Sequence, residues 1–235
     1  MYEFEFARPS SVAEAVAALS EEDAQALGGG QTLIPTLKQR LAMPTTLVSL
    51  GGISELKGIS ASGREVVVKG GTTHAEVAEG ASAYPALAAL AGQIGDPAVR
   101  HQGTIGGSVA NNDPAADYPA ALVALGATVI TSKRSIAADD FFTGLFETAL
   151  EDDEIITAVA FPVAVKSAYA KYPNPASRYA MAGVFVAKTS DGAARVAVTG
   201  AGQDGVFRAS AMESALAQTW SADAVAGIKV NEDTL

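Results

Sequence analysis

Two glycine-rich stretches combine backbone freedom with polar side chains. The first, "GGGQT", runs from Gly28 to Thr32, and the second, "GTIGGS", covers residues 103–108. Glycine lets a ligand approach the main chain, and backbone N–H groups at turns and helix starts bind anions without a basic side chain. A tight structural turn is the alternative explanation for each stretch. Because a pyrophosphate carries two phosphate groups, the pair together favours a dinucleotide site.

Neither stretch matches the common nucleotide-binding fingerprints. Gly28 and Gly30 lack a third glycine at the Rossmann spacing, and the chain has no Gly-Lys-Ser/Thr string. The pattern therefore disfavours a nicotinamide dehydrogenase and a P-loop NTPase. It leaves a dinucleotide held by an unrelated glycine arrangement.

The segment "NNDPAADYP" follows the second glycine stretch directly. It is typical of an Asx-rich turn in which an aspartate caps a helix beginning near Tyr118. A binding role is also open, because Asp117 can accept hydrogen bonds from ribityl or ribose hydroxyls. Asn111 and Asn112 would then serve as neutral donors and acceptors nearby.

Composition excludes several classes of function. The 235 residues are 49% hydrophobic and carry a net charge of -10, which predicts a folded chain and argues against nucleic-acid binding. With no cysteine and only two histidines, the chain cannot hold an iron–sulfur cluster alone and is a poor host for haem or zinc. His74 and Glu76 are interpreted as a solvated surface pair. We expect neither a signal peptide nor a membrane span, and a cytoplasmic location.

The first part of the chain alternates strands and helices. Strands are predicted in "YEFEF", "DAQALGGG" and "TLVSLGG", with helices beginning after Ser10 and Thr32. This order predicts a βαβαβ unit with parallel strands.

Shorter elements follow from residue 58. The strands "EVVVKGG" and "DEIITAVAFP" flank several helices, one of them opened by a capping box of Thr73 and Glu76. A domain boundary is expected near Pro162. Beyond it, Asp191-Gly192 predicts a hairpin, and "SAMESALAQTW" and "SADAVAGI" predict two helices. The ending "NEDTL" carries no cap or strand signal, so we expect the natural chain to continue.

Taken together, "LGGGQTLIPTLKQRLAMPTTLVSLGGI" and "IGDPAVRHQGTIGGSVANNDPAADYPA" resemble the FAD-binding medium subunit of the molybdenum hydroxylases. That family includes aerobic carbon monoxide dehydrogenase and xanthine dehydrogenase-like enzymes. The resemblance covers essentially the whole chain, including "AYAKYPNPASRYAMAGVFVAK". The order and spacing of the two glycine motifs make it specific.

The resemblance implies an α+β fold with an FAD-binding domain of the vanillyl-alcohol oxidase type at residues 1–165. Within it, 1–57 would form a small α/β subdomain and 58–165 a larger antiparallel subdomain. Residues 166–235 would form a small α+β C-terminal domain, a three-stranded antiparallel sheet with helices, shorter than is usual in the family.

The resemblance also implies an FAD site between the two N-terminal subdomains. The pyrophosphate would lie against Gly29 to Thr32 and Thr104 to Ser108, where Ser108 replaces a frequent asparagine or aspartate. The full implied set is Gly28, Gly29, Gly30, Gln31, Thr32, Leu33, Ile34, Thr104, Gly106, Gly107, Ser108, Asn111, Asp117, Ile156, Lys171 and Tyr169.

Individual roles within this set follow from the resemblance too. Asn111 and Asp117 would reach the ribityl or adenosine part, and Ile156 would touch the adenine side. Lys171 matches a family lysine near the flavin, and Tyr169 is a weaker candidate to border the isoalloxazine ring. No catalytic or metal-binding residue is expected.

The function implied is electron transfer in a heterotrimer. Substrate would be hydroxylated at a molybdopterin centre on a large subunit, and electrons would pass through [2Fe–2S] clusters of a small subunit to FAD on this chain, then to an external acceptor. Two alternatives stay open: a stand-alone flavin oxidase, and a non-catalytic assembly subunit that has lost FAD.

Overall fold

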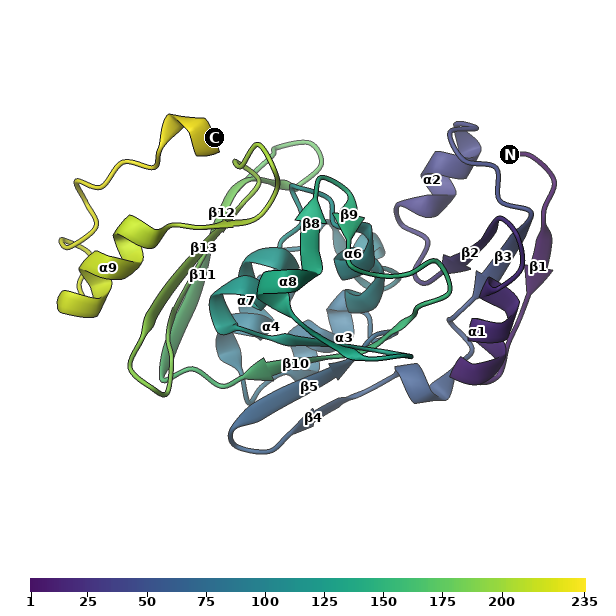
Figure 1. Ribbon diagram of the computed structural model, residues 1–235, viewed down its shortest axis with the longest axis horizontal. Coiled ribbons are helices and arrows are strands. Elements are labelled where there is room, and N and C mark those ends of the chain that lie inside the picture. The colour runs from purple at the N-terminus through teal and green to yellow at the C-terminus, as the bar shows by residue number, and fades with distance from the viewer.

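The N-terminal part of the computed structural model is a small parallel sheet flanked by helices (Figure 1). The structure describes residues 1–235, apart from the side chain of Asp233. The elements here are β1 (Glu5–Ala7), α1 (Val12–Leu19), β2 (Ala24–Leu27), α2 (Leu33–Lys38) and β3 (Thr46–Ser49). The strand order is β1-β3-β2 and both pairings are parallel, which confirms the predicted βαβαβ unit.

The two helix starts in this unit differ slightly from expectation. Ser11, not Ser10, caps α1, because its hydroxyl accepts a hydrogen bond from the backbone of Glu14. Ser10 instead donates to the Glu14 carboxylate. Thr32 precedes α2 as expected, but its side chain makes no capping bond.

A five-stranded antiparallel sheet forms the middle of the molecule, in the order β4-β5-β10-β6-β7. Its strands are β4 (Ile59–Ala61), β5 (Glu65–Lys69), β6 (Thr128–Thr131), β7 (Ser135–Ala137) and β10 (Ile156–Pro162). The short elements around it are η1 (Ser54–Leu56), α3 (His74–Gly80), α4 (Pro85–Gly92), α5 (Pro97–Arg100), α6 (Ile105–Asn111), α7 (Tyr118–Leu125), α8 (Ala138–Phe141), β8 (Phe142–Gly144) and β9 (Glu147–Thr148). The capping box of Thr73 and Glu76 is present at the start of α3.

The third sheet has four antiparallel strands, where three were expected. These are β11 (Lys166–Pro173), β12 (Ala180–Lys188), β13 (Ala194–Thr199) and β14 (Phe207–Arg208), followed by α9 (Ser210–Gln218) and η2 (Glu232–Thr234). The extra strand, β14, is only two residues long, so no alternation in the sequence could indicate it. The hairpin at Asp191-Gly192 is confirmed, with Gly192 at φ +89°.

The expected helix in "SADAVAGI" is wrong. The segment forms only turns, with bonds of the i to i−3 type such as Val225 N to Ala222 O at 3.2 Å. Its run of small residues offers little apolar surface to bury, and Gly227 costs further helix stability.

One core joins the middle sheet to the C-terminal sheet. Every residue of α7 is buried, and the helix packs against β12 and β13 as well as β10. Phe161 of β10 and Phe185 of β12 belong to the same apolar cluster and are both fully buried. In the part of the chain that the structure describes, no helix has the length and apolar character to cross a membrane.

Candidate functional site

A cavity of about 820 Å³ brings the two glycine stretches together. Its volume suits a large small-molecule ligand. The implied site residues that line it are Gly28, Gly29, Gly30, Gln31, Thr32, Leu33, Thr104, Gly106, Gly107, Ser108, Asn111, Asp117 and Ile156. Ile34, Tyr169 and Lys171 are not among the lining residues.

The first glycine stretch runs from the end of β2 to the start of α2 and presses against the second. A Cβ on Gly29 would lie 2.6 Å from the Cα of Gly103, so only glycine permits this approach. Gly30 has φ +70°, which also favours glycine. The two stretches therefore form one continuous backbone surface.

The two stretches differ in their free hydrogen-bond donors. No protein acceptor among the described residues binds the backbone N–H groups between Gly29 and Thr32. In the second stretch, by contrast, the N–H of Gly106 donates to Gly70 O at 2.8 Å and that of Gly107 to Thr104 Oγ1 at 3.1 Å. The first stretch therefore supplies most of the free backbone donors for an anion.

Gly106 and Gly107 have different structural reasons for being glycine. A Cβ on Gly106 would lie 2.6 Å from the carbonyl oxygen of Gly70, so this residue allows α6 to pack on the end of β5. Gly107 is exposed on the cavity wall, and the nearest atom to a Cβ there would be Thr104 Oγ1 at 3.0 Å. A side chain at Gly107 would extend into the cavity.

The sequence suggested that the Asp117 side chain caps α7, but this side chain makes no capping hydrogen bond. Its carboxylate accepts hydrogen bonds from the Tyr169 hydroxyl at 2.5 Å and from Lys171 Nζ at 2.9 Å. Burial raises the pKa of Asp117, and the Lys171 ammonium and the Tyr169 hydroxyl oppose that shift. Tyr169 and Lys171 therefore contact a residue of the cavity wall without lining the cavity themselves.

His74 lines the cavity and was not expected to. Its side chain is buried, not solvated, with its ring centroid 5.5 Å from that of Tyr118. Within the described part of the chain, neither His74 Nδ1 nor the Tyr118 hydroxyl has a hydrogen-bond partner. Burial, aided by the charge of Arg100, lowers the pKa of His74 to about 4.

The capping box already indicated this burial. Glu76 folds back onto the N-cap of α3, so its side chain faces solvent. Residues two apart on a helix point in roughly opposite directions. This geometry predicts that His74, two residues before Glu76, faces the protein interior.

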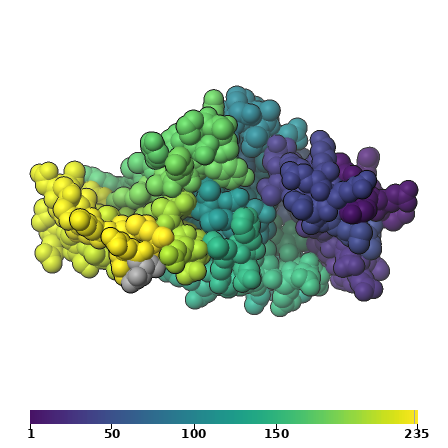
Figure 2. All heavy atoms as spheres, turned by 90° about the horizontal axis from the view of Figure 1, so that it is seen from above, coloured from purple at the N-terminus to yellow at the C-terminus, as the bar shows by residue number. Residues whose placement is uncertain are grey.

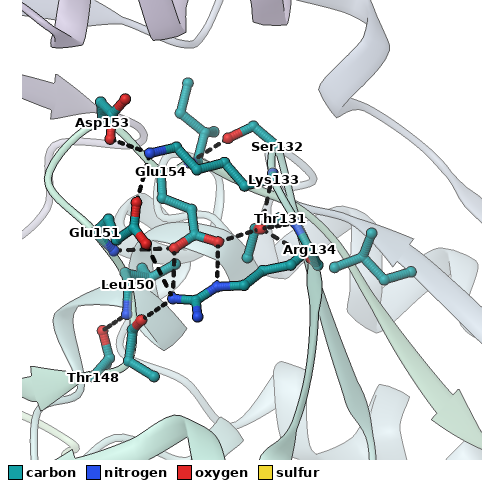
Figure 3. Close-up of polar contacts among 12 residues, drawn as sticks. Thr131, Ser132, Lys133, Arg134, Thr148, Leu150, Glu151, Asp153 and Glu154 are labelled. Atoms are coloured by element: carbon teal, nitrogen blue, oxygen red, sulfur yellow. Dashed lines mark hydrogen bonds and ion pairs between the residues drawn. The ribbon is translucent and has the colours of Figure 1, made fainter.

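A polar network holds another part of the cavity wall (Figure 3). The Glu154 side chain is fully buried and accepts hydrogen bonds from Thr131 Oγ1 at 2.5 Å and Arg134 Nε at 3.1 Å. Burial alone would raise the pKa of Glu154, but the bonds from Arg134, Thr131 and the Glu151 N–H lower it to about 2. The outer members are Lys133 with Glu151 at 2.7 Å and with Asp153 at 2.5 Å.

This network ties the segment after β9 to the turn between β6 and β7. Ser132 completes it, because its hydroxyl accepts a bond from the Ile155 N–H at 3.1 Å. Leu150, Ile155 and Ile156 consequently line the cavity. Only Ile156 of these was expected from the sequence, since the network joins residues about twenty positions apart.

The turn between β11 and β12 supplies three more unexpected lining residues, Ser177, Arg178 and Tyr179. Arg178 adopts a left-handed backbone with φ +61°. Tyr179 is 44% exposed, and burial raises its pKa while a hydrogen bond with Thr32 opposes the shift. The C-terminal sheet therefore reaches the first glycine stretch.

Comparison with known sequences identifies relatives of this chain. A family model described as the FAD binding domain in molybdopterin dehydrogenase matches residues 2–164. The carbon monoxide dehydrogenase medium chain of Afipia carboxidovorans is 40% identical over 201 residues, which are 80% of this chain and 70% of the relative. The nicotine 6-hydroxylase medium subunit of Paenarthrobacter nicotinovorans is 35% identical over 209 residues, 83% of this chain and 74% of that subunit.

Solved structures agree with these sequence matches. Carbon monoxide dehydrogenase from Hydrogenophaga pseudoflava superposes with a TM-score of 0.88 at 35% identity, covering 95% of this chain and 84% of the other. Quinoline 2-oxidoreductase from Pseudomonas putida 86 gives a TM-score of 0.85 at 30% identity, covering 92% and 80%.

Proposed function

This chain belongs to the family of FAD-binding domains in molybdopterin dehydrogenases, and we propose that it is the electron-transfer subunit of a cytoplasmic molybdenum hydroxylase complex. Its partners would be a large subunit with the molybdopterin centre, which hydroxylates the substrate, and a small subunit with [2Fe–2S] clusters. Electrons would arrive from the small subunit and leave to an external acceptor.

One observation carries the assignment to FAD. The cavity of about 820 Å³ joins free backbone N–H groups at Gly29 to Thr32 with a wall at Gly107 that has no side chain. Unpaired N–H donors suit an anion, and the open face at Gly107 gives a pyrophosphate room to approach. The donor set and the shape therefore fit a dinucleotide.

We assign the first glycine stretch to binding the pyrophosphate. The missing side chain at Gly107 would leave the space in which the pyrophosphate lies. Ile156 would lie against the adenine end, and Asn111 and Asp117 beside the sugar or ribityl hydroxyls. Bound FAD would supply an exchange between one-electron and two-electron transfer that side chains do not perform. The chain's own residues bind and orient the group, and we assign no nucleophile or general base.

The proposal extends to the domain organisation. We propose an FAD-binding domain of the vanillyl-alcohol oxidase type at residues 1–165, divided near residue 57, and a C-terminal domain at 166–235. The separate parallel, five-stranded and four-stranded sheets support this division. The cavity, lined from both sides of residue 57 and from the turn at Tyr179, supports an FAD site shared between these parts.

An anaerobic mixing experiment tests the role. The FAD-loaded chain is mixed with a reduced [2Fe–2S] small subunit and, separately, with a panel of aldehydes and alcohols. We expect loss of the visible absorbance of oxidised flavin with the reduced subunit only. Reduction by a small substrate without any partner would instead identify a stand-alone oxidase.

A further inference from the structure

Phe146 is an exposed aromatic residue in a strained backbone conformation at the cavity wall. It lies between β8 and β9, lines the cavity, and is 59% exposed. Its φ is +58°, in the left-handed region that bulky side chains rarely adopt. Such strain persists only where the surroundings impose it, and it is concentrated at functional positions.

Asn112 imposes this conformation on the hairpin. The Asn112 side chain is buried, and its Nδ2 donates to Gly144 O and to Glu147 O, both at 2.8 Å. The backbone carbonyl of Asn112 also accepts a hydrogen bond from the Phe146 N–H at 3.2 Å. Because Asn112 ends α6, the hairpin is fixed to the helix that begins at the second glycine stretch.

Phe146 and Tyr179 are exposed aromatic residues of the wall that come from different hairpins. Seen from above, the segment around residues 140–155 and the turn between β11 and β12 lie on opposite sides of the molecule (Figure 2). The lining segment that follows Phe146 in the chain includes Leu150, Ile155 and Ile156, all apolar. Apolar lining of this kind suits an uncharged planar ring.

We propose that Phe146 binds the adenine ring of FAD by stacking, with Asn112 holding the hairpin in position. The proposal rests on the function proposed above, which places adenine beside Ile156. Base–aromatic stacking needs a ring that is accessible before the ligand arrives, and the strained hairpin presents Phe146 in that way. Preorganisation of this kind lowers the entropic cost of binding.

The test compares Phe146→Ala with Leu145→Ala, using fluorescence titrations with FAD and with FMN, which lacks the adenosine half. Leu145 is 45% exposed in the same hairpin but does not line the cavity. We expect Phe146→Ala to weaken FAD binding at least ~5-fold, the lower end of base–aromatic stacking, and Phe146→Trp to restore it. FMN binding should not change, and Leu145→Ala should behave as the unaltered chain.

Phe146→Gly distinguishes a role in stacking from a purely structural role. Glycine relieves the left-handed strain, so we expect a thermal midpoint equal to or above that of the unaltered chain, together with weakened FAD binding. Unchanged FAD affinity in Phe146→Ala, or equal losses for FAD and FMN, would overturn the proposal while leaving the proposed function intact. If the unaltered chain bound no FAD, both would fail.

Discussion

Lys171 Nζ lies 2.9 Å from the carboxylate of Asp117, and the two side chains are only 2% and 5% exposed. Lys171 is in β11 of the C-terminal sheet, whereas Asp117 precedes α7 and lines the cavity. Lys171 also donates to Gln93 O at 3.1 Å, at the end of α4. This buried ion pair therefore fastens the C-terminal sheet to the cavity wall.

Replacing Lys171 with methionine should destabilise the protein strongly. The substitution leaves the buried Asp117 carboxylate without its counter-ion, which typically costs about 3–5 kcal/mol. Urea unfolding of the FAD-free chain measures the loss directly.

The matched control is the double variant Asp117→Asn with Lys171→Met, which removes both charges. We expect it to lose clearly less stability than the sum of the single variants, because no uncompensated charge stays buried. Strict additivity would contradict the account of the pair.

Gly107→Val should abolish FAD retention while leaving the fold largely intact. The new side chain would extend into the cavity, with only Thr104 Oγ1 close to its Cβ. Gly106→Ala is the counterpart, since its Cβ would meet the Gly70 backbone and should lower the thermal midpoint. Flavin content and thermal midpoint are measured for both variants, and normal flavin content in Gly107→Val would refute the placement of the pyrophosphate.

His74 should make stability depend on pH between about 6.5 and 4. Its folded pKa of about 4 lies below the ordinary value of 6.5, so the unfolded chain binds the proton more readily. The free energy of unfolding should therefore fall as pH drops through this range, by up to about 3 kcal/mol once the folded state is protonated as well.

Unfolding of His74→Phe at pH 7, 6 and 5 isolates this contribution. The free energy of unfolding of the unaltered chain, relative to that of the variant, should fall as the pH falls. His101→Gln, which alters an exposed imidazole, should show the same pH dependence as the unaltered chain. A difference that is constant with pH would show that His74 is not buried in its neutral form.

Glu154→Gln should destabilise the chain at pH 7 by about 2 kcal/mol, because charged hydrogen bonds to Arg134 and Thr131 are weakened. A folded pKa of about 2, below the ordinary 4.5, means that this stabilisation is present above about pH 4.5 and lost as pH falls towards 2. The variant should thus approach the unaltered chain in acid.

Glu151→Gln is the matched control for Glu154→Gln. The Glu151 side chain is 56% exposed, and surface ion pairs contribute about 0–1 kcal/mol. Urea unfolding of both variants at pH 7 and pH 3 makes the comparison. Equal effects of the two substitutions would argue against a special role for the buried carboxylate.

Local rules explain which parts of the structure the sequence could predict. The βαβαβ unit and the box of Thr73 with Glu76 depend on residues a few positions apart, and both are present. The short strand β14 instead exists because it pairs with β13. "SADAVAGI" has helix-compatible residues but does not form the expected helix.

The same distinction between local and long-range causes applies to the site residues. Glycines reveal close backbone approaches, so both glycine stretches of the cavity could be anticipated. Asp117 was expected to cap a helix or meet a ligand, yet its carboxylate binds Tyr169 and Lys171 from a strand more than fifty residues later. Phe146 and Tyr179 reach the cavity only through the geometry of their hairpins, which leaves no local signal in the sequence.

The most direct test of the central claim is an absorption spectrum of the purified chain after incubation with FAD and removal of the unbound flavin, followed by heat release and identification of what was held. The account predicts about one FAD per chain, released intact by heat, with no oxidation of small substrates by the loaded chain alone. A colourless protein after incubation would contradict the cofactor site, and turnover without partners would contradict the electron-transfer role.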